Sequence, residues 1–155
     1  MPFLDERYAA DLGRGATLNR QPIHVGDIGS LDRAVISVGD FATGTGAADK
    51  NVDRLAVLDQ LAGQALRVRM LGSAATDFAW LARGRTDAVL MLSNHPWDVA
   101  AGVAIAREAG AKITDIGGHP YSLSATSAIA AAPTVHVALI QMLTLRKSAT
   151  ATPHT

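Results

Sequence analysis

Short apolar runs alternate with longer amphipathic stretches between residues 34 and 146. The runs predict strands because they are bounded by turn residues, and the stretches predict helices because their apolar positions recur every three or four residues. The predicted strands are 34–38, 66–70, 86–92, 112–115 and 127–131, and the predicted helices are 50–63, 74–83, 97–109 and 133–146. This alternation favours an α/β layered fold in which helices pack on a sheet.

The two ends of the chain have a different pattern. Residues 3–25 consist of short apolar pieces separated by turn residues, which predicts a hairpin or meander. Lys147–Thr155 contains Ser, Thr, Ala and Pro without an apolar anchor, so we expect a flexible tail there. The chain is therefore expected to form a single domain over residues 1–146.

Two predicted helices have identifiable starts and faces. Asp49 is a candidate N-cap for the helix at 50–63, and Ser73 for the helix at 74–83. The second helix places Ala74, Phe78 and Leu81 on one face. The apolar residues expected to form the buried face of the first helix are Val52, Leu55, Leu58 and Leu61.

Composition narrows the class of protein. With 155 residues, 48% of them hydrophobic and 18% charged, the chain suits one globular domain. Equal numbers of acidic and basic residues remove the electrostatic argument for a nucleic-acid or anionic-membrane partner. The absence of cysteine excludes disulfides and cysteine nucleophiles. Without a long apolar run or a signal-peptide pattern, a cytoplasmic protein is expected.

A first candidate site lies at Pro96–Gly102, where a predicted strand gives way to a helix. Ligands collect at strand carboxyl ends in open α/β sheets, and a helix N-terminus favours anions. Asp98 has two interpretations here: it caps the helix or complements its dipole, or it is an oxygen ligand for Mg²⁺. Trp97 is expected to be a core residue, and His95 a supporting or exposed one.

A second candidate site lies at Arg69–Ala75, which also runs from strand to turn to helix start. The free amides at Ser73 and Ala74, next to the Gly72 turn, could face a phosphate or a sugar hydroxyl. The simpler interpretation is an ordinary Ser N-cap. The two sites together would place two helix N-termini at one sheet edge.

The remaining acidic residues give weaker signals. Asp77 lies in the middle of a predicted helix and Asp87 begins a predicted strand, so we expect both to be solvated or cap-like. The five histidines share no metal-ligand spacing, and the glycines at 39, 44 and 46 do not form a phosphate-binding loop motif.

At these candidate sites the chain resembles the inositol monophosphatase family of metal-dependent phosphatases. Trp97–Ala111, WDVAAGVAIAREAGA, fits that family's C-terminal signature, with Ala111 in place of the usual Gly. Arg69–Ala75 is similar to its Arg-x-x-Gly-Ser/Thr-Ala-Ala segment. Arg83–Ala88 resembles the stretch before the signature, and Gly13–Ile23 resembles its Gly-x-Gly-Ala-x-x-Asn-Gly-x-x-Ile stretch.

The resemblance implies Mg²⁺-dependent hydrolysis of a sugar- or polyol-phosphate monoester, with a small phosphorylated metabolite as partner. It implies that Asp98 is a metal ligand and that Gly72, Ser73 and Ala74 bind substrate, while no residue is assigned as catalytic. The implied fold is the C-terminal part of an α-β-α-β-α sandwich with helices on a mixed β-sheet, commonly a homodimer.

Two departures from the family pattern bear on function. The family's Asp-Pro-Ile-Asp-Gly-Thr segment and upstream metal-binding Glu are absent, so we expect a truncated domain that is incompetent by itself. Met91 occupies the position of a substrate-contacting Glu, and a Met cannot accept hydrogen bonds from sugar hydroxyls as Glu does, which argues against inositol phosphate. The alternative function is a non-catalytic fragment or paralogue that associates with a partner or weakly binds phosphometabolites.

Overall fold

The computed structural model describes the backbone of residues 1–150 and the side chains of residues 1–145. Each strand and helix predicted between residues 34 and 146 is present, with ends shifted by up to four residues. The first part of the chain contains the 3-10 helix η1 (Pro2–Leu4), β1 (Tyr8–Asp11), β2 (Gly15–Leu18), β3 (Gln21–Ile23) and the 3-10 helix η2 (Leu31–Arg33). The rest contains β4 (Val35–Val38), α1 (Ala47–Gln64), β5 (Arg67–Arg69), α2 (Ala74–Ala82), β6 (Ala88–Met91), α3 (Pro96–Glu108), β7 (Lys112–Thr114), β8 (Ala128–Ala131) and α4 (Pro133–Thr150).

The main sheet is mixed, with strand order β5-β4-β6-β8-β7. β4 runs parallel to both β5 and β6, whereas β8 runs antiparallel to β6 and β7. Side chains alternate between the two faces of the sheet, as the pleat requires. Leu90 therefore joins the core on one face and its neighbours Val89 and Met91 join the core on the other.

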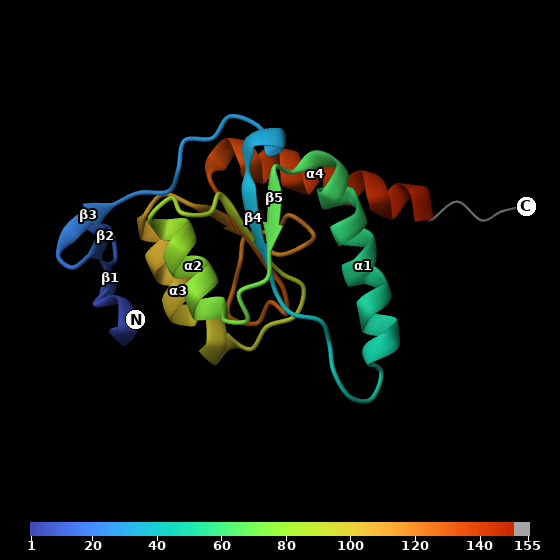
Figure 1. Ribbon diagram of the computed structural model, residues 1–155, viewed down its shortest axis with the longest axis horizontal. Helices are drawn as coiled ribbons and strands as arrows, with labels where there is room; N and C mark the ends of the chain where they lie inside the picture. Colours follow the sequence, from blue (N-terminus) through green and yellow to red (C-terminus); the bar gives the residue numbers. More distant parts are fainter. Residues whose placement is uncertain (151–155) are drawn as a thin grey trace, which may run out of the picture.

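The described residues form four layers (Figure 1). Helices α1 and α4 cover one face of the main sheet, where Val57 and Leu61 of α1 and Leu139 of α4 share a core with Ile36. Helices α2 and α3 cover the other face. The antiparallel sheet β1-β2-β3 packs on the far side of α3, at the left of Figure 1. The predicted layered sandwich on a mixed sheet is confirmed.

Helix α1 departs from the prediction in both its start and its buried face. It begins after Gly46, and Asp49 lies in its first turn rather than capping it. Val57 and Leu61 face the sheet, so Arg54, three residues before Val57, is buried on the same side. The predicted core positions Val52 and Leu55 are instead 64% and 56% exposed, because they point away from that face.

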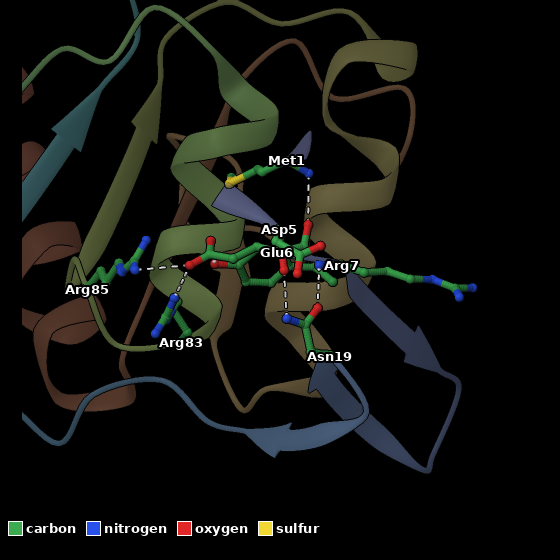
Figure 2. Close-up of polar contacts among 8 residues, drawn as sticks. Met1, Asp5, Glu6, Arg7, Asn19, Arg83 and Arg85 are labelled. Atoms are coloured by element: carbon green, nitrogen blue, oxygen red, sulfur yellow. Dashed lines mark hydrogen bonds and ion pairs between the residues drawn. The ribbon is translucent and has the colours of Figure 1, made fainter. Parts of the chain in front are cut away.

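Two glutamates attach the small sheet to the helical layer. The Glu6 carboxylate forms ion pairs with Arg83 and Arg85, the latter at 3.0 Å (Figure 2). It also accepts a 2.8 Å hydrogen bond from the Tyr8 hydroxyl. Although burial acts to raise the pKa of Glu6, these partners hold it below its ordinary value. At the end of α3, the Glu108 carboxylate accepts hydrogen bonds from the backbone amides of Gly13, in the turn between β1 and β2, and Gly15, the first residue of β2.

The last helix extends past its predicted end. It begins at Pro133 as predicted and continues to Thr150, so the first four residues of the predicted tail are helical. The rest of that predicted tail lies outside the described residues. Among the described residues, no helix combines the length and apolar character needed to cross a bilayer.

Candidate functional site

A cavity of about 630 Å³ lies beyond the carboxyl ends of the parallel strands β4, β5 and β6. Its walls are the loop after β4, the turn before α2, and the segment that leads from β6 into α3. The first turns of α2 and α3 both border it. The predicted convergence of two helix N-termini at one sheet edge is therefore present.

The four predicted site residues all line this cavity, namely Gly72, Ser73, Ala74 and Asp98. Ser73 is the N-cap of α2, and its Oγ accepts a 3.4 Å hydrogen bond from the amide of Thr76. Gly72 has φ +73°, a left-handed conformation that favours glycine in the turn. The structure thus brings the four residues together, and their roles toward a ligand stay predictions.

Asp98 lies in the first turn of α3 and its side chain is exposed. The N-cap is His95, and no side chain makes a capping hydrogen bond to the helix start. Of the two interpretations for Asp98, a hydrogen-bonded cap is therefore not observed. A favourable interaction with the helix dipole and a role as an oxygen ligand both fit its position.

Trp97 is not a core residue, contrary to the prediction. Its side chain is 78% exposed and borders the cavity. Its indole stacks on the imidazole of His95, with ring centroids 4.7 Å apart and planes 8° apart. The buried positions of α3 are taken by residues such as Val99 and Val103, which leaves the preceding Trp97 on the outer side of the helix start.

Asp77 was expected to be solvated or cap-like, and it is instead 1% exposed and borders the cavity. Its Oδ1 accepts a hydrogen bond from the hydroxyl of Ser37 on β4. Burial raises the pKa of Asp77 to about 6, and the negative charge of Asp40 adds to that rise, although the Ser37 hydrogen bond opposes it. The sequence signal was Ser37, a polar residue within the apolar run of β4.

Asp87 is also buried rather than solvated. Its Oδ2 accepts a 2.8 Å hydrogen bond from the amide of Val35, and its own amide donates to the Val35 carbonyl at 2.8 Å. Asp87 therefore holds the start of β6 against the start of β4, away from the cavity.

Sequence reasoning missed two charged residues of the site, Asp40 and Arg54. Asp40 follows β4, and its Oδ2 lies 3.7 Å from the point where a Cβ on Gly72 would stand. Arg54 is buried on α1 and borders the same cavity. Its Nε donates to the Asp40 carbonyl at 3.2 Å, and its Nη2 donates to the Ser93 hydroxyl at 2.6 Å.

Arg54 therefore joins the loop after β4 to the segment after β6. None of the ion pairs among the described side chains involves Arg54, so its positive charge is not neutralised by a contacting carboxylate. The amphipathic pattern of α1 gave no hint of this, because it assigned the buried face to other positions.

The described residues do not form a complete metal centre. Among them, no three Asp, Glu or His side chains lie close enough together to hold an ion. Mg²⁺ requires near-octahedral oxygen coordination, completed in enzymes by waters and substrate phosphate around one or two carboxylates. Asp98 provides one such carboxylate. It can be one ligand of a magnesium ion, but by itself it does not form a metal site.

Met91 ends β6 at the wall of the cavity and is 4% exposed. Its sulfur lies 2.9 Å from the point where a Cβ on Gly39 would stand, so the thioether packs directly on that glycine. The cavity therefore has an apolar wall at the position where the resemblance leads one to expect a carboxylate.

Comparison with known proteins decides the family. The model of the inositol monophosphatase family matches residues 1–148. The chain belongs to that family. It is 35% identical over 143 residues to the Mycobacterium tuberculosis protein named "Probable inositol 1-monophosphatase ImpA", covering 92% of this chain and 53% of the relative. It is 36% identical over 142 residues to the inositol-1-monophosphatase of Synechocystis, covering 92% of this chain and 48% of that protein.

A solved structure supports the same family assignment. The inositol monophosphatase from Anabaena superposes with a TM-score of 0.83 at 34% identity, over 93% of this chain and 56% of that one. The chain thus spans about half the length of the curated family members it matches. The match locates the observed layers within the fold of the family, as the resemblance implied.

Proposed function

We propose that this chain forms the substrate side of a phosphomonoesterase site, in which Gly72, Ser73 and Ala74 bind the phosphate ester and Asp98 ligates Mg²⁺. The observation that supports this is the convergence of the α2 and α3 N-termini, with Asp98, on one cavity. Helix N-termini carry partial positive charge and unpaired amides, and both favour a phosphate.

The start of α2 has donors suited to this role. Its first amides lack partners within the helix, and Ser73 already caps the amide of Thr76. The amides of Ala74 and Ala75 belong to residues that line the cavity and remain for an anion. The Arg54 charge behind the loop after β4 adds to the attraction.

The reaction proposed is hydrolysis of the ester. A water oxygen bonds to phosphorus while the bond from phosphorus to the alcohol oxygen breaks, and that oxygen takes up a proton. Mg²⁺, when bound, would polarise the phosphate and lower the pKa of the attacking water. The chain's own residues would hold the phosphate and orient it, which contributes to rate by positioning.

We expect the isolated chain not to hydrolyse phosphomonoesters at a rate typical of an enzyme. Without a set of three ligands among the described residues, Mg²⁺ would be held weakly and the attacking water would not be positioned. This expectation distinguishes binding of the phosphate ester from its turnover, and each can be measured separately.

The test combines phosphate release with binding. Phosphate release from inositol 1-phosphate and phenyl phosphate is measured at millimolar Mg²⁺, and inorganic phosphate is titrated while its ³¹P resonance is followed. We expect release at background, and phosphate binding that Mg²⁺ strengthens in the parent chain but not in Asp98→Asn. Asp59→Asn, an exposed residue of α1, is the matched control. Failure to bind phosphate would refute the proposal, and turnover abolished by Asp98→Asn would refute the expected incompetence.

A second candidate is a binding module for phosphorylated metabolites that never turns them over. The lack of a three-ligand set among the described side chains favours it. Adding the portion of a family member that this chain does not cover, as a separate polypeptide, discriminates between the two. Phosphate release after mixing supports the enzyme, and unchanged release with intact phosphate binding supports the module.

A further inference from the structure

The cavity is lined by both polar and apolar side chains. Its polar lining includes the α2 start and Asp98, which the proposed function assigns to phosphate and metal, together with Asp40, Arg54 and Asp77. Its apolar lining includes Phe41, Met91 and Trp97, here called the apolar wall, and none of these three side chains can accept a strong hydrogen bond. A ligand that fills the cavity therefore meets charged and polar groups as well as these three apolar side chains.

Two of the apolar residues are aromatic and open to solvent. Phe41 is 40% exposed and Trp97 is 78% exposed, although both line the cavity. His95 covers one face of the indole by stacking, which fixes the plane of the ring and leaves its other face free. A flat ring held in this way is a surface on which another flat ring can stack.

Met91 is the third residue of the apolar wall. Its sulfur is fixed against Gly39, directly before the loop that carries Phe41. Thioethers make favourable contacts with aromatic rings, whereas a hydroxyl placed there would lose water without gaining a partner. The wall thus favours an aromatic group and disfavours a polyol.

From this wall we infer that the alcohol part of the substrate is a flat aromatic ring, held between Trp97, Phe41 and Met91, with its phosphate toward Gly72–Ala74. The inference rests on the proposed function for the position of the phosphate. It replaces the sugar or polyol that the family resemblance implies with an aryl phosphate monoester.

The experiment uses Trp97 as its own reporter. The chain has two tryptophans, and Trp80→Phe leaves Trp97 as the single indole. Trp80→Phe removes no observed hydrogen bond, because the Nε1 of Trp80 is buried without a hydrogen-bond partner among the described residues. Phenyl phosphate, inositol 1-phosphate and inorganic phosphate are titrated with and without Mg²⁺, following Trp97 emission and ³¹P resonances.

We expect phenyl phosphate to bind about three- to tenfold more tightly than inositol 1-phosphate, which is the range for one added aromatic contact. Only phenyl phosphate is expected to shift Trp97 emission to the blue. Trp97→Leu changes an exposed side chain that is not part of the core, so we expect the protein still to fold. This substitution should abolish the preference for phenyl phosphate over inositol 1-phosphate in the ³¹P titration. Met91→Glu should reverse it toward inositol 1-phosphate. Phe3→Leu, fully exposed outside the cavity, is the matched control.

The outcomes separate this inference from the proposed function. If inorganic phosphate binds but phenyl phosphate binds no more tightly than inositol 1-phosphate, the aromatic assignment is overturned and the phosphate site stands. If phenyl phosphate shifts Trp97 emission while inorganic phosphate does not bind, the aromatic wall is supported and the phosphate site fails. If none of the three binds, both are overturned.

Discussion

Replacing Asp77 with Asn should change how the stability of this protein depends on pH. Asp77 is buried against Ser37, and burial together with the nearby charge of Asp40 raises its pKa from 3.8 to about 6. A carboxyl whose pKa rises on folding binds its proton more tightly in the folded state. Its ionisation therefore costs stability as pH rises through the interval from about 4 to about 6.

The magnitude follows from that pKa change. It corresponds to about 3 kcal/mol of unfolding free energy, present as a penalty above pH 6 and absent below pH 4. The side chain introduced by Asp77→Asn has no such ionisation, but its amide N–H donors cost about 1–3 kcal/mol if they find no partner. That second cost does not depend on pH. The way in which the difference between the unfolding free energies of the two proteins changes with pH therefore reports the ionisation of the Asp77 carboxyl alone.

The pH effect of Asp77 has to be measured as a difference between the parent and Asp77→Asn, because the ionisation of His136 also changes the stability of the parent with pH. His136 is buried beside Thr114, and burial, aided by the charge of Lys112, lowers its pKa from 6.5 to about 4. A lowered His pKa means that stability is lost as pH falls from about 6.5 to 4. This effect opposes that of Asp77 over nearly the same interval, so the parent chain alone would show little net change.

The assay is urea unfolding followed by circular dichroism from pH 4 to pH 8, for the parent, Asp77→Asn and the exposed control Asp59→Asn. We expect the stability of Asp77→Asn relative to the parent to rise by about 3 kcal/mol between pH 4 and pH 7, with a slope near 1.4 kcal/mol per pH unit at its steepest. The control should show no such rise. A difference that stays constant with pH would refute the assignment of the titration to Asp77.

Two further predictions concern packing and charge. Gly102→Ala should destabilise the fold by about 1–3 kcal/mol in urea unfolding, because its Cβ would lie 2.6 Å from the Cβ of Phe78, whereas Gly63→Ala, with nothing within 4 Å, should be neutral or stabilising. Asp40→Asn should tighten inorganic phosphate binding about two- to fivefold without Mg²⁺, since it removes a negative charge beside Gly72; weaker binding in the ³¹P titration would contradict this.

The sequence predicted elements and junctions well because those depend on local signals. The N-cap at Ser73 and the helix start at Pro133 are set by residues within one turn, and both are present. The convergence of Gly72 and Asp98 on one cavity followed from the rule that parallel strands share an edge for their carboxyl ends. These features could be predicted because they depend on neighbouring residues and on the general geometry of parallel sheets.

The errors arose where a residue's surroundings come from distant parts of the chain. Asp77 lies buried against Ser37 of β4, forty residues earlier, whose hydroxyl donates a hydrogen bond to it. Arg54 is buried because Val57 and Leu61 turn that face of α1 toward the sheet, a choice that periodicity alone left open. Trp97 is exposed although its residue type favours burial, because smaller residues of α3 fill the space against α2.

These same distant contacts determine how firmly the cavity is held. The Ser37–Asp77 hydrogen bond ties the start of α2 to β4, and Arg54 ties the loop after β4 to the segment after β6. All three cavity walls are thus connected by polar contacts within this chain, and none of these contacts involves Asp98 or Gly72. Sites whose supporting residues are locked by such contacts hold their geometry before a ligand arrives. The proposed substrate side is therefore held in place by residues other than those proposed to touch the substrate.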